Sequence, residues 1–163
     1  LYSELTQKID TLTHLLNRRS YESRLASLRG HAVIYYLDVD EFKSVNDTFG
    51  HGVGDAVLAE VGSTIYAVFS KVGYCYHIGG DEFCVIAQIS DTAAEKYLSE
   101  FLRELTARRV KNEHLPHVSV GYACFNPVLG SVEDAIKRAD RMMYHYKRKL
   151  KSEALTNNDT VKS

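Results

Sequence analysis

Apolar residues recur along this chain of 163 residues in two patterns, short near-continuous runs and longer stripes at helical spacing. The run at 32–39, AVIYYLDV, is apolar and aromatic until it ends in acid, which is typical of a central strand covered on both faces. Two further runs, GYCYHI and FCVIAQI, are separated only by GGDE and therefore predict a β-hairpin. A fourth strand is predicted at 117–125, HVSVGYACF.

Apolar stripes predict helices between these strands. One stripe runs through 53–70, the next follows the hairpin from Ala94, and the last begins at Val132. Before the first strand, Asn17 is a suitable N-cap for a helix that Gly30 would end. The order βαββαβ predicts an α/β domain of the α+β kind, whose central, mainly antiparallel sheet is covered by helices.

The two ends of the chain are expected to differ from this single domain. The N-terminal stripe consists of Leu1, Leu5, Ile9 and Leu12. Its spacing predicts that 1–12 is the end of a connecting helix from an upstream segment, and the missing initial Met suggests an excised piece. The domain would then occupy 13–151, and the polar tail at 152–163 is expected to be disordered.

Charge and composition narrow the function classes. The formal net charge is −1, so there is no electrostatic case for nucleic-acid binding or for a membrane surface. No apolar stretch appears long enough in the sequence to span a bilayer. Cys75, Cys84 and Cys124 lie in strand-like runs without CxxC spacing, which favours buried reduced thiols in a cytosolic domain.

Carboxylates lie at the end of the first predicted strand and in the turn of the predicted hairpin, which are expected to be neighbours in the sheet. Asp38 and Asp40 end the first strand, and the hairpin turn carries Asp81 and Glu82. The first strand of such a sheet commonly lies beside the central hairpin, so these acids can converge and would repel unless a cation neutralises them. Oxygen ligands without His or Cys favour magnesium. GGDE alone could equally be an ordinary turn, and the second acidic site moves the balance toward function.

The segment FKSVNDTFGHGVGDAVL adds candidate nucleotide contacts. Lys43 can meet phosphate as a point charge. Asn46 and Asp55 offer the amide and carboxylate that complement a guanine edge. The glycines permit close backbone approach but do not form a P-loop, because GK[ST] is missing and they follow a helical segment.

Five segments in order resemble the GGDEF family, the diguanylate cyclases. They are IDTLTHLLNRRSYE, LDVDEFKSVNDTFGHGVGDAVL, IGGDEF, VSVGYA and RADRMMYHYK, and the resemblance covers the chain from about Asp10 to Lys151. The resemblance implies a fold similar to the palm of adenylate cyclases and polymerases. It also implies a homodimer, each protomer binding one GTP, that forms cyclic di-GMP and two pyrophosphates in bacterial second-messenger signalling.

The same resemblance implies the metal ligands and the catalytic acids. Asp38, Asp81 and the backbone carbonyl of Val39 would hold Mg²⁺, with Mn²⁺ as an alternative. Asp81, with Glu82 beside it, would assist deprotonation of the attacking 3′-hydroxyl. The enzyme would act in the cytoplasm, alone or as the cytoplasmic part of a larger, membrane-bound protein, under an upstream sensory or regulatory domain.

The remaining implied contacts are to GTP. Asn46 and Asp55 would bind guanine, and His51 would line the same pocket. The basic residues on the phosphates would be Lys43, Lys147 and Lys151.

Three positions depart from the usual family pattern. His14 and Leu150 replace glycines, and His77 replaces an arginine before the hairpin. None removes a metal ligand or a guanine contact, so activity is expected. A GTP-binding domain that does not cyclise is one alternative, although its usual sign, loss of the motif acids, is missing. A cyclase for other purine nucleotides is another, against which Asp55 argues.

The product-binding motif RxxD of many relatives is also expected to be missing. Its window at 70–73 reads SKVG, with neither the Arg nor the Asp. Lys71 cannot both grip a phosphate bidentately and stack on guanine as Arg does. The sequence therefore predicts no tight product inhibition through this window.

Overall fold

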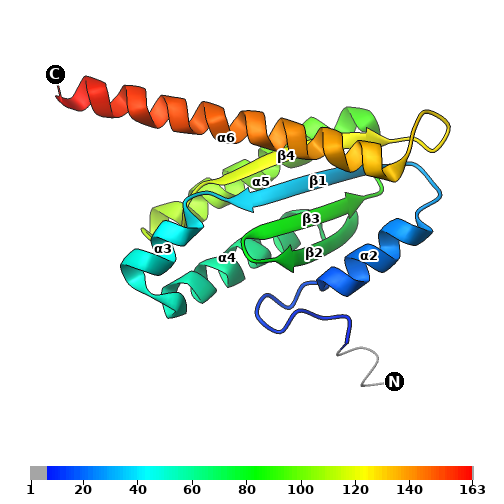
Figure 1. Ribbon diagram of the computed structural model, residues 1–163, viewed down its shortest axis with the longest axis horizontal. Helices are drawn as coiled ribbons and strands as arrows, with labels where there is room; N and C mark the ends of the chain where they lie inside the picture. The colour runs from blue at the N-terminus through cyan, green and yellow to red at the C-terminus, as the bar shows by residue number, and fades with distance from the viewer. Residues whose placement is uncertain (1–6, 163) are drawn as a thin grey trace.

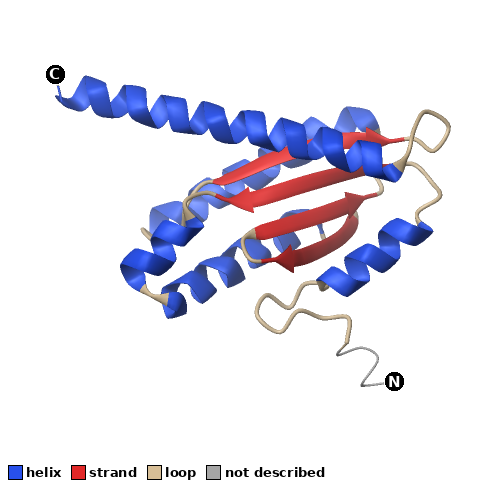
Figure 2. Cartoon of the chain, in the orientation of Figure 1, coloured by secondary structure: helices blue, strands red, loops and turns tan. Residues whose placement is uncertain are grey.

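A computed structural model of the chain describes residues 7–162, most of which lie in helices and in one four-stranded sheet (Figure 2). In chain order the elements are α2 (Arg18–Ser27), β1 (Ala32–Val39), α3 (Phe42–Phe49), α4 (His51–Phe69), β2 (Gly73–Gly79), β3 (Glu82–Ala87), the short 3₁₀ helix η1 (Asp91–Ala93), α5 (Ala94–Lys111), β4 (Val118–Phe125) and α6 (Val132–Lys162).

The sheet has the strand order β2-β3-β1-β4, and every neighbouring pair is antiparallel. The predicted α+β arrangement is confirmed, with β1 central and next to the hairpin. The register places Asp38 of β1 opposite Glu82 of β3 and opposite Ser119 of β4. The acidic end of the first strand therefore meets the acidic turn.

Helices cover both faces of the sheet (Figure 1). Alternate residues of β1 point to opposite sides, which explains why almost the whole strand is apolar. Val33, Tyr35 and Leu37 belong to a core shared with α4 and α5. Ala32 and Ile34 belong to a second core, to which α2 and α6 contribute. The site at the end of β1 thus stands on a strand held from both sides.

The expected connecting helix at 1–12 is wrong for the part that is described. Leu1 and Leu5 lie outside the described residues, and 7–12 forms turns and an isolated bridge between Ile9 and Leu16. The side chain of Asp10 competes with helix formation, because its Oδ2 accepts from the backbone N–H and the hydroxyl of Thr13, at 2.9 and 2.7 Å.

The expectation of a disordered tail from Ser152 is also wrong, because α6 continues to Lys162. Neither Gly nor Pro interrupts the helix from Val132 onward. Lys, Glu, Ala and Leu are good helix formers as far as Leu155, and a helix already anchored on the sheet needs no new nucleation to continue beyond it. The helix consequently projects beyond the body of the domain (Figure 1).

Contrary to the sequence-based expectation, α4 is long and apolar enough to cross a membrane by length and composition. Its apolar residues have another explanation, because Val57, Val61 and Ile65 are buried in the core on the sheet. Such burial is what the crossover helix of an α+β domain requires.

The cysteines carry free thiols, as predicted. Cys75 and Cys84 are buried, and Cys124 is half-buried. Burial raises the pKa of the Cys75 thiol to about 12, which keeps that thiol protonated and unreactive at neutral pH.

Candidate functional site

The GGDE turn is a tight hairpin tip built on two glycines. Gly79 pairs with Glu82, which leaves Gly80 and Asp81 as the two residues of the tip. The φ angles of Gly79 and Gly80 are +147° and +49°, in the region that side-chain-bearing residues rarely adopt. The turn therefore needs glycine at both positions, and it presents Asp81 at the end of the β2–β3 ribbon.

The His77 side chain contacts this turn and stabilises it. The side chain is 8% exposed and stacks on the Phe83 ring, with ring centroids 4.7 Å apart. Its Nε2 lies 2.8 Å from the carbonyl oxygen of Gly80, and its Nδ1 lies 3.0 Å from Asp10 Oδ2. The histidine that departs from the family pattern thus connects the N-terminal turn to the acidic hairpin, a role that the sequence analysis did not identify.

Asp38 lies at the end of β1, against the hairpin tip. The backbone N–H of Val39 donates to the carbonyl oxygen of Asp81 at 3.0 Å, which fixes the turn beside the strand. The Asp38 side chain is 11% exposed, and its Oδ2 accepts from Lys147 Nζ at 2.8 Å. Its Oδ1 is buried and has no hydrogen-bond partner among residues 7–162. One carboxylate oxygen is therefore left for a ligand.

Burial and crowding dominate the electrostatics. Burial, followed by the neighbouring Asp81 carboxylate, raises the pKa of Asp38, and the Lys147 ammonium opposes this shift. Burial also raises the pKa of Asp40, whose Oδ1 accepts from the Ser119 hydroxyl at 2.7 Å. The hydrogen bond to Asp38 raises the pKa of Lys147. Three acids and one lysine therefore share a poorly solvated corner.

These carboxylates fit a magnesium ion. Within the part of the chain that is described, no three His, Cys, Asp or Glu side chains form a complete metal cluster. Magnesium does not need one, because it is usually bound by one or two carboxylates together with substrate phosphates and water. The unpaired Oδ1 of Asp38, with the Asp81 carboxylate as its neighbour, is an oxygen-only position where a divalent cation would relieve repulsion.

Glu82, the second acid of the turn, is held by the sheet. It is half-buried, and its Oε2 accepts from the Tyr36 hydroxyl at 3.1 Å. Tyr36 lies two residues before Asp38 on β1, so one strand positions both acids. This contact has no signal in the sequence, because it depends on the register between β1 and β3.

The predicted guanine contacts lie on two packed helices, α3 and α4. Asn46 is half-buried, and a Cβ added to Gly54 would lie 1.8 Å from its Oδ1. Gly54 is therefore needed for the Asn46 side chain to reach α4, where Asp55 follows at once. Asp55 and His51 are exposed on α4, and Lys43 is exposed on α3. All four are open to solvent at least in part, as substrate contacts must be.

Of the two predicted phosphate contacts on α6, only Lys147 is in contact with the acids. Its Nζ donates to Asp38 Oδ2, as described above. Lys151 is exposed one helical turn further along α6.

Comparison with known proteins identifies the family of this arrangement. The family model described as diguanylate cyclase, GGDEF domain, matches residues 7–153. A probable diguanylate cyclase, DgcC of Escherichia coli K12, is 33% identical over 151 residues, covering 85% of this chain and 40% of that protein. A diguanylate cyclase of Vibrio cholerae is 30% identical over 149 residues, covering 85% of this chain and 46% of that protein. The chain thus spans less than half of these relatives.

A solved structure agrees with the sequence comparison. The GGDEF domain of DgcB from Caulobacter crescentus, crystallised in complex with c-di-GMP, superposes with a TM-score of 0.76 at 31% identity. The match covers 87% of this chain and 91% of that domain. The fold of this chain, with its four-stranded sheet, is therefore that of a GGDEF domain.

Proposed function

Because this chain belongs to the GGDEF family of diguanylate cyclases, we propose that it condenses two GTP molecules into cyclic di-GMP and two pyrophosphates. The observation that carries the proposal is the meeting of Asp38 with the GGDE tip. A buried carboxylate with one unpaired oxygen lies beside a second acid, and Lys147 is the only residue among 7–162 that forms an ion pair with either of them. Such a corner suits a cation that carries phosphates.

The metal in this proposal is Mg²⁺, with Mn²⁺ as a substitute. Asp38, Asp81 and the backbone carbonyl of Val39 would hold it. When bound, the metal supplies Lewis-acid polarisation of the phosphate oxygens. The protein contributes rigidity, because β1 and the hairpin tip are joined by the hydrogen bond from Val39 N–H to the Asp81 carbonyl.

In the chemical step, the 3′-oxygen of one GTP forms a bond to the α-phosphorus of the other, and the bond from that phosphorus to pyrophosphate breaks. The proton of the hydroxyl would leave with the help of Asp81, with Glu82 beside it. The Tyr36 hydroxyl fixes the Glu82 carboxylate. A second such transfer closes the ring, so each cycle releases two pyrophosphates.

Substrate selection is assigned to α3 and α4. Asn46 and Asp55 would bind the guanine edge, with His51 lining the pocket. The support for this assignment is the close packing of Asn46 on Gly54, the residue that precedes Asp55 on α4. Lys43, Lys147 and Lys151 would contact the phosphates.

Each domain would bind one nucleotide, so the active form in this proposal is a homodimer with facing sites. Holding two reactants in one complex can lower a barrier by about 7–11 kcal/mol, which makes dimer formation a natural point of control. An upstream sensory or regulatory domain would set the dimer geometry. The reaction would take place in the cytoplasm, where GTP is available.

The test is incubation with GTP and Mg²⁺, followed by chromatographic separation of the products across a range of protein concentrations. Asp81→Ala should lower the rate by at least about a hundredfold, as expected for loss of a principal electrostatic group. Glu113→Ala is the matched control, because its side chain is 89% exposed and lies in the loop before β4.

Unchanged turnover in Asp81→Ala would refute the assignment of the hairpin acid. Binding of GTP without any product at high protein concentration would instead support a regulatory domain that does not cyclise.

A further inference from the structure

His77 is buried between two hydrogen-bond acceptors. Its Nδ1 lies 3.0 Å from Asp10 Oδ2, and its Nε2 lies 2.8 Å from the carbonyl oxygen of Gly80. A backbone carbonyl can only accept a hydrogen bond, and so can an ionised carboxylate. A neutral imidazole carries one N–H donor, whereas the doubly protonated imidazolium carries two. Only the imidazolium can therefore donate to both partners at once.

The Asp10 carboxyl group is fixed as an acceptor. Oδ2, the oxygen that faces His77, also accepts from the backbone N–H and the hydroxyl of Thr13, at 2.9 and 2.7 Å. Burial raises the pKa of Asp10, but the hydrogen bonds to Thr13 and His77 outweigh burial and hold this pKa below its ordinary value. Asp10 is consequently a carboxylate at neutral pH, and it cannot supply the proton for its contact with His77.

The other surroundings of His77 suit a positive charge. The imidazole ring stacks on the Phe83 ring with centroids 4.7 Å apart, and an aromatic face attracts a cation within about 6 Å. The buried face of α4, which packs on the same sheet, is uncharged. Among residues 7–162, only Asp10 forms an ion pair with His77. The charged groups on the neighbouring elements are Asp10 in the N-terminal turn, Arg18 on α2, and Asp81 and Glu82 in the hairpin.

The contact with Gly80 affects the candidate site because it fixes the peptide unit that precedes Asp81. Gly80 adopts a φ angle of +49°, and a glycine backbone has more freedom to move than any other. On the other side of Asp81, its own carbonyl oxygen accepts from Val39 N–H at 3.0 Å. One hydrogen bond thus holds the peptide unit on each side of Asp81, and losing either would let its carboxylate move.

A neutral His77 would break this arrangement at the hairpin tip. Its single N–H would donate to Asp10, because a hydrogen bond to a carboxylate is roughly twice as strong as one to a neutral carbonyl. Nε2 would then present a lone pair to the Gly80 oxygen, which is also an acceptor. The tip would keep its bond to Val39 and lose its bond to His77.

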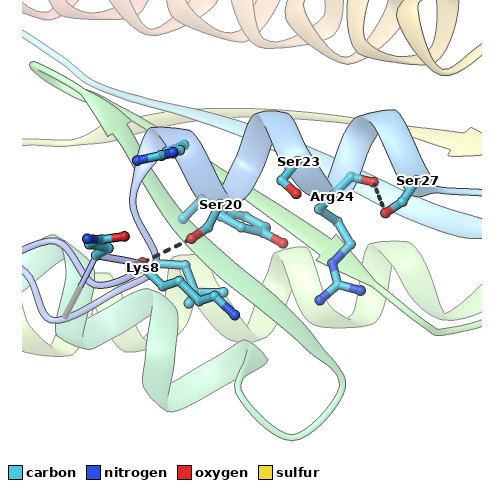
Figure 3. A pocket seen from close by; sticks show the side chains of 9 residues that line it. Lys8, Ser20, Ser23, Arg24 and Ser27 are labelled. Carbon is cyan, nitrogen blue, oxygen red and sulfur yellow. Dashed lines mark hydrogen bonds between the residues drawn. The ribbon is translucent and has the colours of Figure 1, made fainter. Parts of the chain in front are cut away.

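Asp10 can hold His77 in place because the N-terminal turn is itself attached to α2. At the edge of a cavity between this turn and α2, the Ser20 hydroxyl donates to the Lys8 carbonyl at 3.1 Å (Figure 3). The backbone N–H of Asn17 donates to the same carbonyl at 2.8 Å. The acid that pairs with His77 is therefore held at a fixed position.

We propose that His77 is a positioning residue for Asp81, and that it performs this role in its doubly protonated form. The cyclase would lose activity as the pH rises and His77 gives its second proton to solvent, and it would recover when the pH falls. This inference rests on the proposed function for its activity readout, whereas the hydrogen bonds can be tested without turnover.

The first experiment uses the wild-type protein in EDTA, without nucleotide. NMR of the His77 ring nitrogens follows their protonation from about pH 5.5 to 9, because histidine side chains ordinarily change charge between about pH 5 and 8. We expect both nitrogens to carry protons at the acidic end. The backbone amides of Gly80 and Asp81 should shift with the same midpoint as the ring, and in His77→Gln these amide shifts should disappear.

The second experiment compares the cyclase rates of the wild type and His77→Arg, with GTP and Mg²⁺, over the same pH range. Arginine stays charged throughout and carries several donors, so titration of any other group acts on both proteins and cancels in the ratio of their rates. The ratio of wild type to His77→Arg should fall by about tenfold or more as the pH rises, since misplacing a reacting group by 1 Å can cost about a hundredfold.

His31→Arg is the matched control for the second experiment. His31 also pairs with an aspartate, Asp91, but it precedes β1 and so lies at the opposite end of that strand from Asp38. The ratio of wild type to His31→Arg should stay constant with pH. If His77→Arg does not fold, His77→Gln takes its place, and the ratio must fall in the same way because glutamine does not titrate.

Three results would overturn the proposal. They are a His77 ring that keeps one unprotonated nitrogen throughout the range, amide shifts at Gly80 and Asp81 that persist in His77→Gln, and a ratio of wild type to His77→Arg that is the same at every pH. If the wild type forms no cyclic di-GMP at any pH, the proposed function fails, and the NMR results alone then decide the role of His77.

Discussion

β4 and α6 are in close backbone contact at Gly121, and replacing this glycine with alanine tests whether that contact sets the position of α6. A Cβ at Gly121 would lie 2.1 Å from the carbonyl oxygen of Ala139 and 2.2 Å from the backbone nitrogen of Met143. Both atoms belong to the backbone of α6, so no side-chain rotation can make room. Restoring ordinary contact distances requires α6 to move away from β4 by about 1 Å, a shift comparable to one extra methylene.

The loss of stability in Gly121→Ala should lie at the upper end of the range for overpacking substitutions. Inserting a methyl group into a packed core typically costs about 1–3 kcal/mol, and a rigid helix cannot absorb it locally, so we expect Gly121→Ala to lower the free energy of unfolding by about 3 kcal/mol or more. The consequence reaches the candidate site. Lys147 lies one turn beyond Met143 on α6 and bonds Asp38 at 2.8 Å, so displacing α6 should also reduce cyclase activity.

The assay is urea denaturation followed by circular dichroism, because the chain has no tryptophan. Gly30→Ala is the matched control, since a Cβ there meets nothing within 4 Å. That variant should lie within about 1 kcal/mol of the wild type, on the stabilising side if the unfolded chain loses entropy. If Gly121→Ala and Gly30→Ala unfold at the same urea concentration, the reasoning about α6 is wrong.

Three further predictions concern single contacts. Burial alone would raise the pKa of Asp10, but hydrogen bonds from Thr13 and His77 lower this pKa overall. The Asp10 carboxylate therefore stabilises the fold above its unfolded pKa of about 3.9, and this stabilisation is lost as the pH falls further. Asp10→Asn should therefore destabilise the domain near neutral pH and make little difference at about pH 3, in urea titrations at both values; an equal loss at both would contradict this. Asn17→Ala should cost about 1 kcal/mol in the same assay, because its side chain accepts from Ser20 N–H at 3.0 Å and caps α2. GTP should bind more tightly than ATP by about 2–4 kcal/mol in calorimetry, and Asp55→Ala should remove most of that difference; equal binding of the two nucleotides by the wild type would refute the guanine assignment.

The strands could be predicted from the sequence because each lies in the interior. The run predicted at 32–39 is β1, Ala32–Val39, and the run predicted at 117–125 differs from β4 by one residue. A strand buried on both faces must be apolar at nearly every position, so its first and last residues can be predicted from the ends of the apolar run. The hairpin was equally visible, since GGDE is the only break between two such runs.

Helix ends and terminal segments were predicted less well. α2 ends at Ser27, three residues before Gly30, because Leu28 takes an extended conformation and packs against the second core. The N-terminal stripe that suggested a helix includes Ile9, which instead pairs with Leu16. In each case a specific contact outweighs a local helix preference that is worth only about 0–0.7 kcal/mol per residue.

The sequence by itself determined the strands, the acidic motifs and the residue types of the candidate nucleotide site, because these depend on burial and on side-chain chemistry along short segments. Only the tertiary structure decided which groups meet. Lys147 reaches Asp38 across 109 positions, and His77 connects Asp10 to the Gly80 carbonyl. Such contacts arise from strand register and helix packing, which bring together side chains whose separation along the chain carries no signal.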